Sequence, residues 1–282
     1  YLEAMGDDFP DEPRLVIWPE AALPNFLLQD PDTLDSVALR LGNRVLIAGT
    51  ARIDRYVQPG PEYFNSLAIL TANSRMRGPL AIYDKNRLVP FGELAAADFI
   101  PFGHDISGIL PDAMQQLAED GFTPGTPPRP LELPSGETFL PLICYEALFP
   151  YLVRQNLADA DFLVNISIDS WFGGKIGPDQ HFAQASYRSI ESGRPMVRVA
   201  NLGETGLIGP YGREIDGNRK VSELNGWPVK VVDVALPLTK IDTTYTRIGN
   251  TLALVLLVLR HRVVRPASRL HKWTVKSSWC RP

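Results

Sequence analysis

Three residues whose types could carry out acyl transfer each follow a short apolar run. Glu20 offers a carboxylate, Lys85 a cation, and Cys144 is the one thiol that directly follows such a run. A sheet presents to a cleft the side chains at the ends of its strands, so three such residues can converge on one point. The pattern therefore predicts a Cys-Glu-Lys site.

These residue types suit the chemistry because each meets one requirement of a cysteine nucleophile. A thiol is only slightly ionised near neutral pH, so it needs a base or a nearby cation. We expect Glu20 to take the proton of Cys144 and later to activate the second substrate. We expect Lys85 to hold the thiolate and, with the backbone, to stabilise the oxyanion that forms on acyl attack.

Each residue also has a structural interpretation when it is taken alone. A single cysteine after an apolar run is usually a small buried hydrophobic residue. Glu20 could be the N-terminal acid of a helix, and Lys85 could be a surface charge. His181 lies in a predicted helix and is interpreted as structural rather than as part of a Cys-His dyad. The catalytic hypothesis therefore depends on the three residues together with their flanking sequence.

The elements that must position these residues are strands mixed with helices. Short apolar runs rich in β-branched residues predict buried strands. They are Leu15–Trp18, Val45–Ala48, Ser66–Leu70, Leu80–Tyr83, Phe139–Cys144, Phe162–Ile166, Met196–Ala200, Leu207–Gly209 and Val229–Val234. The mixture predicts an α/β or α+β domain.

Two segments have the apolar period of a helix. In the first, four apolar residues fall on one face, between Asp32 as the expected N-cap and Gly42 as the expected stop. The second is Gln180–Ser192. Phe91–Pro134 has no clear period and many Pro and Gly residues, which indicates long loops over the body, and loops of this length are often functional.

Composition argues against several classes of function. The net charge of −4 comes from 28 basic and 32 acidic residues, but the part from Arg247 to Pro282 holds eight Lys or Arg and no Asp or Glu. The preceding part therefore carries 20 basic and 32 acidic residues, which argues against nucleic acid as a partner. Two cysteines without CxxC spacing and four histidines argue against a disulfide framework and a zinc site. We predict no metal and no cofactor.

An apolar segment, Gly249–Leu259, precedes the basic residues of the tail. A membrane-spanning helix needs about 20 apolar residues, so this run is too short to predict one by itself. A core helix and a C-terminal amphipathic helix are the alternatives. The basic tail could contact anionic lipid or be solvated. The chain opens at Tyr1, without methionine or a signal peptide, as a fragment would.

The flanking residues make the combination specific. They closely resemble three signature segments of the carbon–nitrogen hydrolase (nitrilase) superfamily, here Trp18-Pro19-Glu20, Tyr83–Glu93 and Ile143-Cys144-Tyr145-Glu146. Other segments resemble the apolipoprotein N-acyltransferase family within it, namely Asp169–Gly173, Gly177–Phe182, Gly193-Arg194-Pro195 and Tyr245–Asn250. The resemblance extends over residues 14–260.

The resemblance implies a nitrilase-like αββα sandwich that faces the periplasm from the bacterial inner membrane. It implies that an acyl chain moves from a phospholipid to Cys144, and then to the α-amino group of an N-terminal diacylglyceryl-cysteine on a lipoprotein. Glu20, Lys85 and Cys144 are then the catalytic triad. The implied partners are the phospholipid donor, the lipoprotein acceptor and the membrane, and we expect a monomer.

The matching motifs also imply supporting residues. Glu93 and Glu146 are expected to be carboxylates that orient Lys85 and keep it charged, and Tyr145 is expected to lie beside the nucleophile. A loop acid that caps nearby N–H groups is the alternative for Glu93.

An aromatic pair and two departures from the family pattern complete the candidate site. Trp171 and Phe172 are candidate substrate-binding residues of an acyl channel, with core packing as the alternative. Ile168 and Leu202 stand where the family has Asn, and these apolar residues are expected to alter local turns or substrate contacts.

The resemblance divides the chain into three parts. Residues 1–246 are expected to form a catalytic domain that lacks its first strand, residues 247–262 a remnant of the last transmembrane helix, and residues 263–282 a basic tail. A soluble amidase that passes the acyl group to water and a domain kept only for binding are competing functions. The apolar segment favours the acyltransferase, and the positive charges after it fit a cytoplasmic C-terminus.

Overall fold

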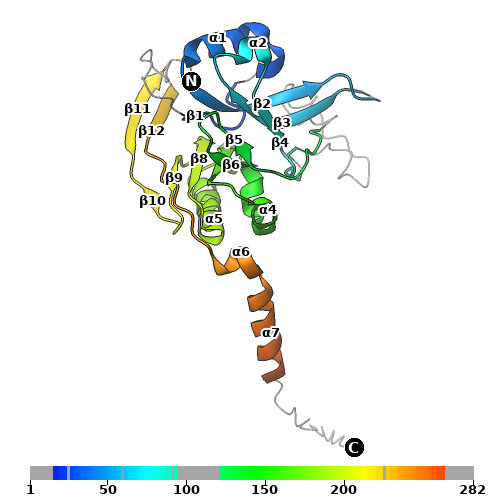
Figure 1. The fold of residues 1–282 in the computed structure, drawn as a ribbon, viewed down its shortest axis with the longest axis vertical. Helices are drawn as coiled ribbons and strands as arrows, with labels where there is room; N and C mark the ends of the chain where they lie inside the picture. The colour runs from blue at the N-terminus through cyan, green and yellow to red at the C-terminus, as the bar shows by residue number, and fades with distance from the viewer. Residues whose placement is uncertain are drawn as a thin grey trace, which may run out of the picture.

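Two sheets pack face to face in the computed structural model, which describes residues 15–23, 26–58, 60–90, 92–93, 121–224 and 227–263. Helices cover the outer face of each sheet, so the layers follow the order helix, sheet, sheet, helix (Figure 1). This arrangement confirms the expected αββα sandwich.

The first sheet carries the strand ends at which Glu20 and Lys85 lie. Its strands, in spatial order, are β1 (Leu15–Ile17), β2 (Val45–Asp54), β3 (Glu62–Leu70) and β4 (Ala81–Asp84). β1 is parallel to β2, whereas β3 is antiparallel to both β2 and β4. β1 and β4 therefore run in the same direction and end at the same edge. The outer face is covered by η2 (Leu27–Gln29), α1 (Pro31–Leu41) and α2 (Ser74–Arg77).

The second sheet carries Cys144 at the end of a parallel strand. In spatial order its strands are β10 (Glu214–Ile215), β9 (Gly206–Ile208), β8 (Met196–Asn201), β7 (Phe162–Ile168), β6 (Thr138–Ile143) and β5 (Leu131–Glu132). β6, β7 and β8 are parallel, so the residues that follow them share one edge.

Short helices follow the parallel strands of the second sheet. The 3-10 helices η5 (Cys144–Leu148) and η6 (Ser170–Phe172) follow β6 and β7, and α4 (Pro150–Asn156) and α5 (Ile176–Ser192) cover the outer face. A separate antiparallel ribbon is formed by β11 (Asn218–Leu224) and β12 (Trp227–Asp233).

Alternation of side chains along the strands builds three apolar layers. In β7, Phe162 and Val164 enter the layer between the sheets, whereas Leu163 enters the layer beneath α4 and α5. In β2, Ile47 enters the central layer, whereas Leu46 packs with the residues of α1. A register shift of one residue would exchange these faces, so burial on both sides fixes how the strands pair.

Every predicted strand is present, but some bounds and elements differ from the prediction. β2 continues to Asp54 and β3 begins at Glu62, because the two strands form one long hairpin whose outer part is only partly buried. An apolar run marks only the buried half of such a hairpin. The strands β5, β10 and β11 and the helices α2, α4 and α6 were not predicted, since their sequences carry little apolar period.

The helix bounds also differ from the prediction. The N-cap of α1 is Asp30 and not Asp32, because Asp30 Oδ1 accepts from the backbone N–H of Thr33 at 3.2 Å and Pro31 takes the first helical position. α5 begins at Ile176 and not at Gln180. Of the predicted loops, residues 91 and 94–120 lie outside the described residues, and the described end contains β5.

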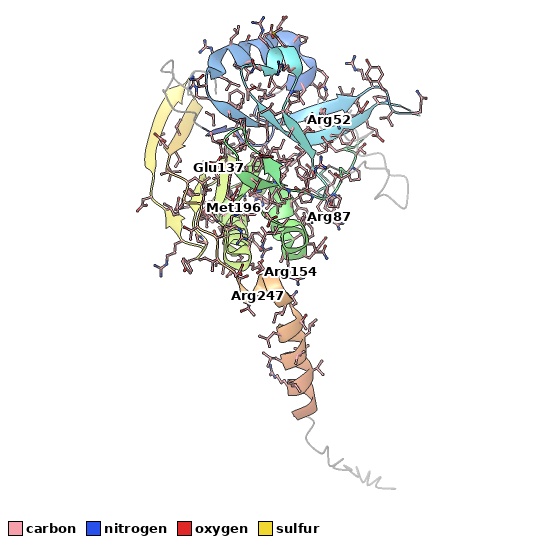
Figure 2. The ribbon with its side chains drawn as sticks, in the orientation of Figure 1. Arg52, Arg87, Glu137, Arg154, Met196 and Arg247 are labelled. Atoms are coloured by element: carbon pink, nitrogen blue, oxygen red, sulfur yellow. The ribbon has the colours of Figure 1, made fainter. Side chains whose placement is uncertain are left out.

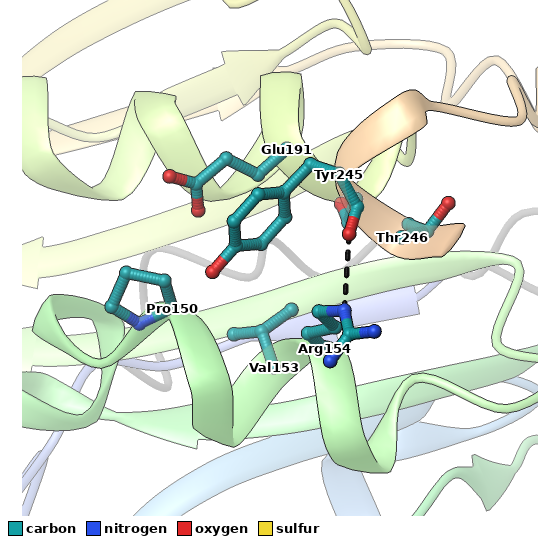
Figure 3. Close-up of a pocket in the computed structure, with 7 residues that line it drawn as sticks. Pro150, Val153, Arg154, Glu191, Tyr245 and Thr246 are labelled. Carbon is teal, nitrogen blue, oxygen red and sulfur yellow. Dashed lines mark hydrogen bonds between the residues drawn. The ribbon is translucent and has the colours of Figure 1, made fainter. Parts of the chain in front are cut away.

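The chain then leaves the sandwich as α6 (Thr244–Ile248) and α7 (Thr251–Val263). Arg154 of α4 donates to the carbonyl oxygens of Tyr245 at 3.0 Å and Arg247 at 3.2 Å (Figures 2 and 3). A shallow pocket lies at this junction, lined by Pro150, Val153, Arg154, Glu191, Ser192, Tyr245 and Thr246 (Figure 3). α7 points away from the body (Figure 1). The large apolar side chains of Leu252 and of residues 254–259 are exposed. Within the ranges that the structure describes, none of the helices has the length and apolar character that a membrane crossing requires.

Gly193, which ends α5, is predicted to be harder to replace than other glycines with positive φ. Its φ is 65°, and a Cβ there would overlap the carbonyl oxygen of Ile241. Gly173 has a φ of 61° with open space around it, and Gly174 has open space without a positive φ. We expect the free energy of unfolding to fall by about 3 kcal/mol in Gly193→Ala, about 1 kcal/mol in Gly173→Ala and less than about 0.5 kcal/mol in Gly174→Ala. Denaturant unfolding measures all three, and equal losses in the first two would contradict the overlap.

Candidate active site

Glu20, Lys85 and Cys144 lie together where the ends of the two sheets meet. Oε1 of Glu20 lies 3.4 Å from Nζ of Lys85. Oε2 of Glu20 accepts from the backbone N–H of Ile168, at the end of β7, at 2.8 Å, which joins the first sheet to the second. The charges of Glu20 and Lys85 also act on the pKa of the Cys144 thiol. The structure therefore brings together the three residues that the sequence singled out.

Lys85 is buried among carboxylates, with 1% of its surface exposed. Its ammonium group lies 2.7 Å from Oε1 of Glu93 as well as 3.4 Å from Glu20. Burial lowers the pKa of Lys85, but the charges of Glu20 and Glu93 outweigh it and hold the pKa above its ordinary value. Lys85 is therefore a fixed cation. Glu93 also accepts from the backbone N–H of Val89 at 2.8 Å, so it both holds Lys85 and caps a loop N–H group.

Asn65 of β3 joins the two carboxylates. Its Nδ2 donates to Oε1 of Glu20 at 2.6 Å and to Oε1 of Glu93 at 2.8 Å. The backbone carbonyl of the same residue accepts from the backbone N–H of Lys85 at 2.8 Å. The sequence argument missed Asn65, although two polar residues, Asn65 and Ser66, directly before the apolar run of a buried strand are a signal that could have found it.

Glu146 supports the site by a different route from the one expected. Its Oε1 accepts from the Tyr83 hydroxyl at 2.6 Å and from the backbone N–H groups of Asn86 at 2.8 Å and Arg87 at 3.1 Å. Its Oε2 accepts from the backbone N–H of Ile143 at 2.8 Å. Glu146 thus fixes the chain on both sides of Lys85 to the residue before the nucleophile. Burial raises the pKa of Glu146, and these hydrogen bonds offset only part of that effect.

Cys144 occupies a strained position at the junction of β6 and η5. Its φ is 51°, in the left-handed region that non-glycine residues seldom adopt. Burial, followed by the negative charge of Glu20, raises the pKa of the thiol to about 12, although Lys85 acts in the opposite direction. The resting thiol is therefore protonated at neutral pH, and a base is required at the moment of attack.

The aromatic candidates lie at the surface near this edge. Tyr145 is half-buried, with its ring edge-to-face against Phe149 at 5.0 Å between centroids. Trp171 is 59% and Phe172 is 49% exposed, so the core-packing alternative is wrong for Trp171. Phe172 contacts the ring of His181 edge-on at 5.3 Å.

The two departures from the family pattern have different structural effects. Ile168 contributes its backbone N–H to Glu20, and this contact does not depend on the side chain. Leu202 has a φ of 56°, a conformation that Asn adopts more readily than Leu, and its side chain is 67% exposed. The substitution at Leu202 therefore adds local strain and exposed apolar surface next to β8.

Comparison with known proteins relates the chain to one family. The family model described as "Carbon-nitrogen hydrolase" matches residues 12–241. The apolipoprotein N-acyltransferase of Agrobacterium fabrum is 39% identical over 209 residues, which cover 73% of this chain and 37% of that protein. That of Brucella suis biovar 1 is 36% identical over 267 residues, which cover 92% of this chain and 47% of that protein. The chain thus spans less than half the length of these curated relatives.

Solved structures support the fold. One is an amidase of the nitrilase superfamily from Nesterenkonia AN1, in a variant in which a cysteine is replaced by serine. It has 18% sequence identity to this chain and a TM-score of 0.50, and the alignment covers 87% of this chain and 84% of that one. At this identity the likeness concerns the fold alone.

The raised pKa of Cys144 predicts slow alkylation by iodoacetamide at pH 7 and a rate that still increases at pH 10. Glu20→Gln removes a negative charge that raises the thiol pKa, so the pH profile of alkylation should move to lower pH. Lys85→Met removes a positive charge that lowers the thiol pKa, so the profile should move to higher pH. All variants carry Cys280→Ala, so that mass spectrometry measures alkylation of Cys144 alone. Asp35→Asn is the control and should leave the profile unchanged, because it changes a partly exposed carboxylate of α1 that pairs with Arg75 and is not among the charges that act on the thiol. Identical profiles in all variants would contradict the assigned charges.

Proposed function

The chain belongs to the carbon–nitrogen hydrolase family, and from this premise we propose that it transfers an acyl chain through a thioester on Cys144. The observation that carries the proposal is the buried ion pair of Glu20 and Lys85 beside a thiol. The relatives named apolipoprotein N-acyltransferase support the choice of substrates. The donor is a phospholipid ester, and the acceptor is the α-amino group of an N-terminal diacylglyceryl-cysteine.

In the first step, Sγ of Cys144 attacks the ester carbonyl carbon while Glu20 takes the thiol proton. Because the pKa of the thiol is raised to about 12, this proton leaves during the attack rather than before it. The ammonium group of Lys85 and backbone N–H groups at the start of η5 stabilise the oxyanion. The ester C–O bond then breaks, the lysophospholipid leaves as an alcohol with the proton from Glu20, and the acyl chain remains on sulfur.

In the second step, the acceptor amine attacks the thioester carbonyl. Glu20 takes a proton from the amine, the C–S bond breaks, and the same proton returns to the thiolate of Cys144, so the site is restored. Lys85 stabilises the second oxyanion as it did the first, and Glu93 keeps it charged and in place. One carboxylate and one cation thus serve both halves of the reaction.

An amine must compete with far more concentrated water, so a transferase needs a site that excludes water. The exposed apolar surface of α7 supports a position at a membrane. We place the protein at the bacterial inner membrane with its body in the periplasm. In this scheme residues 1–246 form the catalytic domain, residues 247–262 belong to the last membrane helix, and residues 263–282 form a basic tail.

The second step predicts how the acyl-enzyme decays. The full-length gene product, incubated with phospholipid vesicles, should gain one acyl chain by intact mass. The Cys280→Ala variant should gain it as well, whereas Cys144→Ala should not. The acyl-enzyme should hydrolyse slowly in buffer and discharge at least about tenfold faster with a diacylglyceryl-cysteine peptide, because the amine is positioned at the thioester. Rapid decay in buffer without acceleration by the peptide would identify a hydrolase instead.

We further propose that Trp171 and Phe172 contact the acyl chain of the donor. Trp171→Ala should raise KM for a long-chain phospholipid about tenfold with an unchanged Tm, because an aromatic contact of this kind contributes on the order of 1–2 kcal/mol. Tyr56→Ala, at the exposed tip of the β2–β3 hairpin, removes an aromatic residue that is 96% exposed and is the matched control. An equal change of KM in both variants would argue against an acyl contact at Trp171.

A further inference from the structure

A second polar cluster contacts the backbone of Cys144 and plays no part in the chemistry described above. It comprises buried side chains from the ends of β7 and β8 and from α5, namely Asn165, Ser167, Asp169, His181 and Arg198. None of them is more than 4% exposed. A buried network of this size is costly unless its members satisfy one another, so each of its contacts matters.

Asp169 is the centre of this cluster. Its Oδ1 accepts from the Ser167 hydroxyl at 2.8 Å and lies 2.9 Å from Nδ1 of His181. Nη2 of Arg198 donates to its Oδ2 at 2.8 Å, and Nη1 of Arg198 donates to Oδ1 of Asn165. Burial raises the pKa of Asp169, but His181 and Arg198 outweigh it and lower the pKa, so the carboxylate is charged. A Cβ on Gly203 would overlap this carboxylate, so the carboxylate packs directly against the backbone of Gly203.

Two members of the cluster reach the nucleophile itself. Nε2 of His181 lies 3.3 Å from the backbone carbonyl oxygen of Cys144, and a carbonyl oxygen can only accept, so Nε2 carries the hydrogen. The Ser167 hydroxyl lies near the side chain of Cys144 and lowers the pKa of its thiol. The contact from His181 therefore fixes the peptide group that follows the strained Cα, and Ser167 acts on the thiol itself.

A left-handed non-glycine residue costs about 1–3 kcal/mol and persists only where its surroundings fix it. We propose that His181, held by Asp169 and Arg198, is a positioning residue that keeps Cys144 in its left-handed conformation and so aims Sγ at the acyl carbonyl. Since a hydroxyl has one hydrogen, Ser167 can turn it from Asp169 to the thiolate when Sγ loses its proton, while Arg198 still neutralises Asp169. His181 acts on the backbone and not as the base.

The purely structural alternative is that His181 serves only to satisfy buried Asp169. Two amide variants separate these roles, because an Asn amide overlays Nδ1 of histidine and a Gln amide overlays Nε2. His181→Asn keeps a polar group at the Nδ1 position for Asp169 and Arg198 and loses the donor for the Cys144 carbonyl, whereas His181→Gln does the opposite. Positioning of the nucleophile requires His181→Gln to be the more reactive variant, and a structural role requires His181→Asn to be the more reactive.

The readout is alkylation of Cys144 by iodoacetamide in the Cys280→Ala full-length protein, with Tm measured in parallel. Alkylation needs no acyl donor, so its outcome is independent of the proposed acyl transfer on which the mechanistic role rests. We expect His181→Asn to react at least about tenfold more slowly than His181→Gln, because small displacements of a nucleophile cause losses of this size. Equal rates, or a faster His181→Asn, would overturn the proposal.

A second variant covers the case in which both His181 variants fail to fold. Ser167→Ala removes one small buried hydroxyl and should shift the pH profile of alkylation upward, because that hydroxyl lowers the thiol pKa. The charges of Glu20, Lys85 and Glu93, which also act on this thiol, are unchanged by the substitution. An unshifted profile would overturn the assigned contact between the cluster and Sγ.

Discussion

A lysine ammonium group with 1% exposure has lost its water, and only anionic partners can replace that hydration. For Lys85 the partners are Glu20, after β1, and Glu93, in the turn beyond β4, and Asn65 of β3 binds both carboxylates. Removing one partner of such a buried pair costs about 3–5 kcal/mol, because the remaining charge is uncompensated. The strands of the first sheet must therefore be in register before the site can exist.

The layout of the sandwich adds a second constraint, because the thiol and its expected base belong to different sheets. Cys144 follows β6 of the second sheet, whereas Glu20 and Lys85 follow strands of the first. The bond from the Ile168 backbone to Glu20 joins the two sheets at the site, and the apolar layer that contains Phe139 and Phe162 sets their separation. Activity then depends on packing between the sheets as much as on the site residues themselves.

The sequence predicted the residues that end strands, because an apolar run followed by a charged or nucleophilic residue is a local signal. It missed Asn65 and Arg198, since a polar residue within an apolar strand looks locally like an interruption, and its role appears only when neighbouring strands supply its partners. The N-cap at Asp30 was misplaced for a similar reason, because Pro31 was not recognised as the first helical residue. The order of the strands within each sheet was not predicted, as pairing depends on both buried faces at once.

The attachment of α6 has a mechanical consequence for the helix that follows it. Arg154 binds two carbonyl oxygens of α6, and its guanidinium group also leaves little space beside Gly249. The start of α7 is therefore fixed to α4 and is not a flexible joint. At about 1.5 Å per residue, the 13 residues of α7 form a helix about 20 Å long. The direction in which α7 leaves the body is therefore set by α4, which packs on the second sheet through Leu152 and Val153.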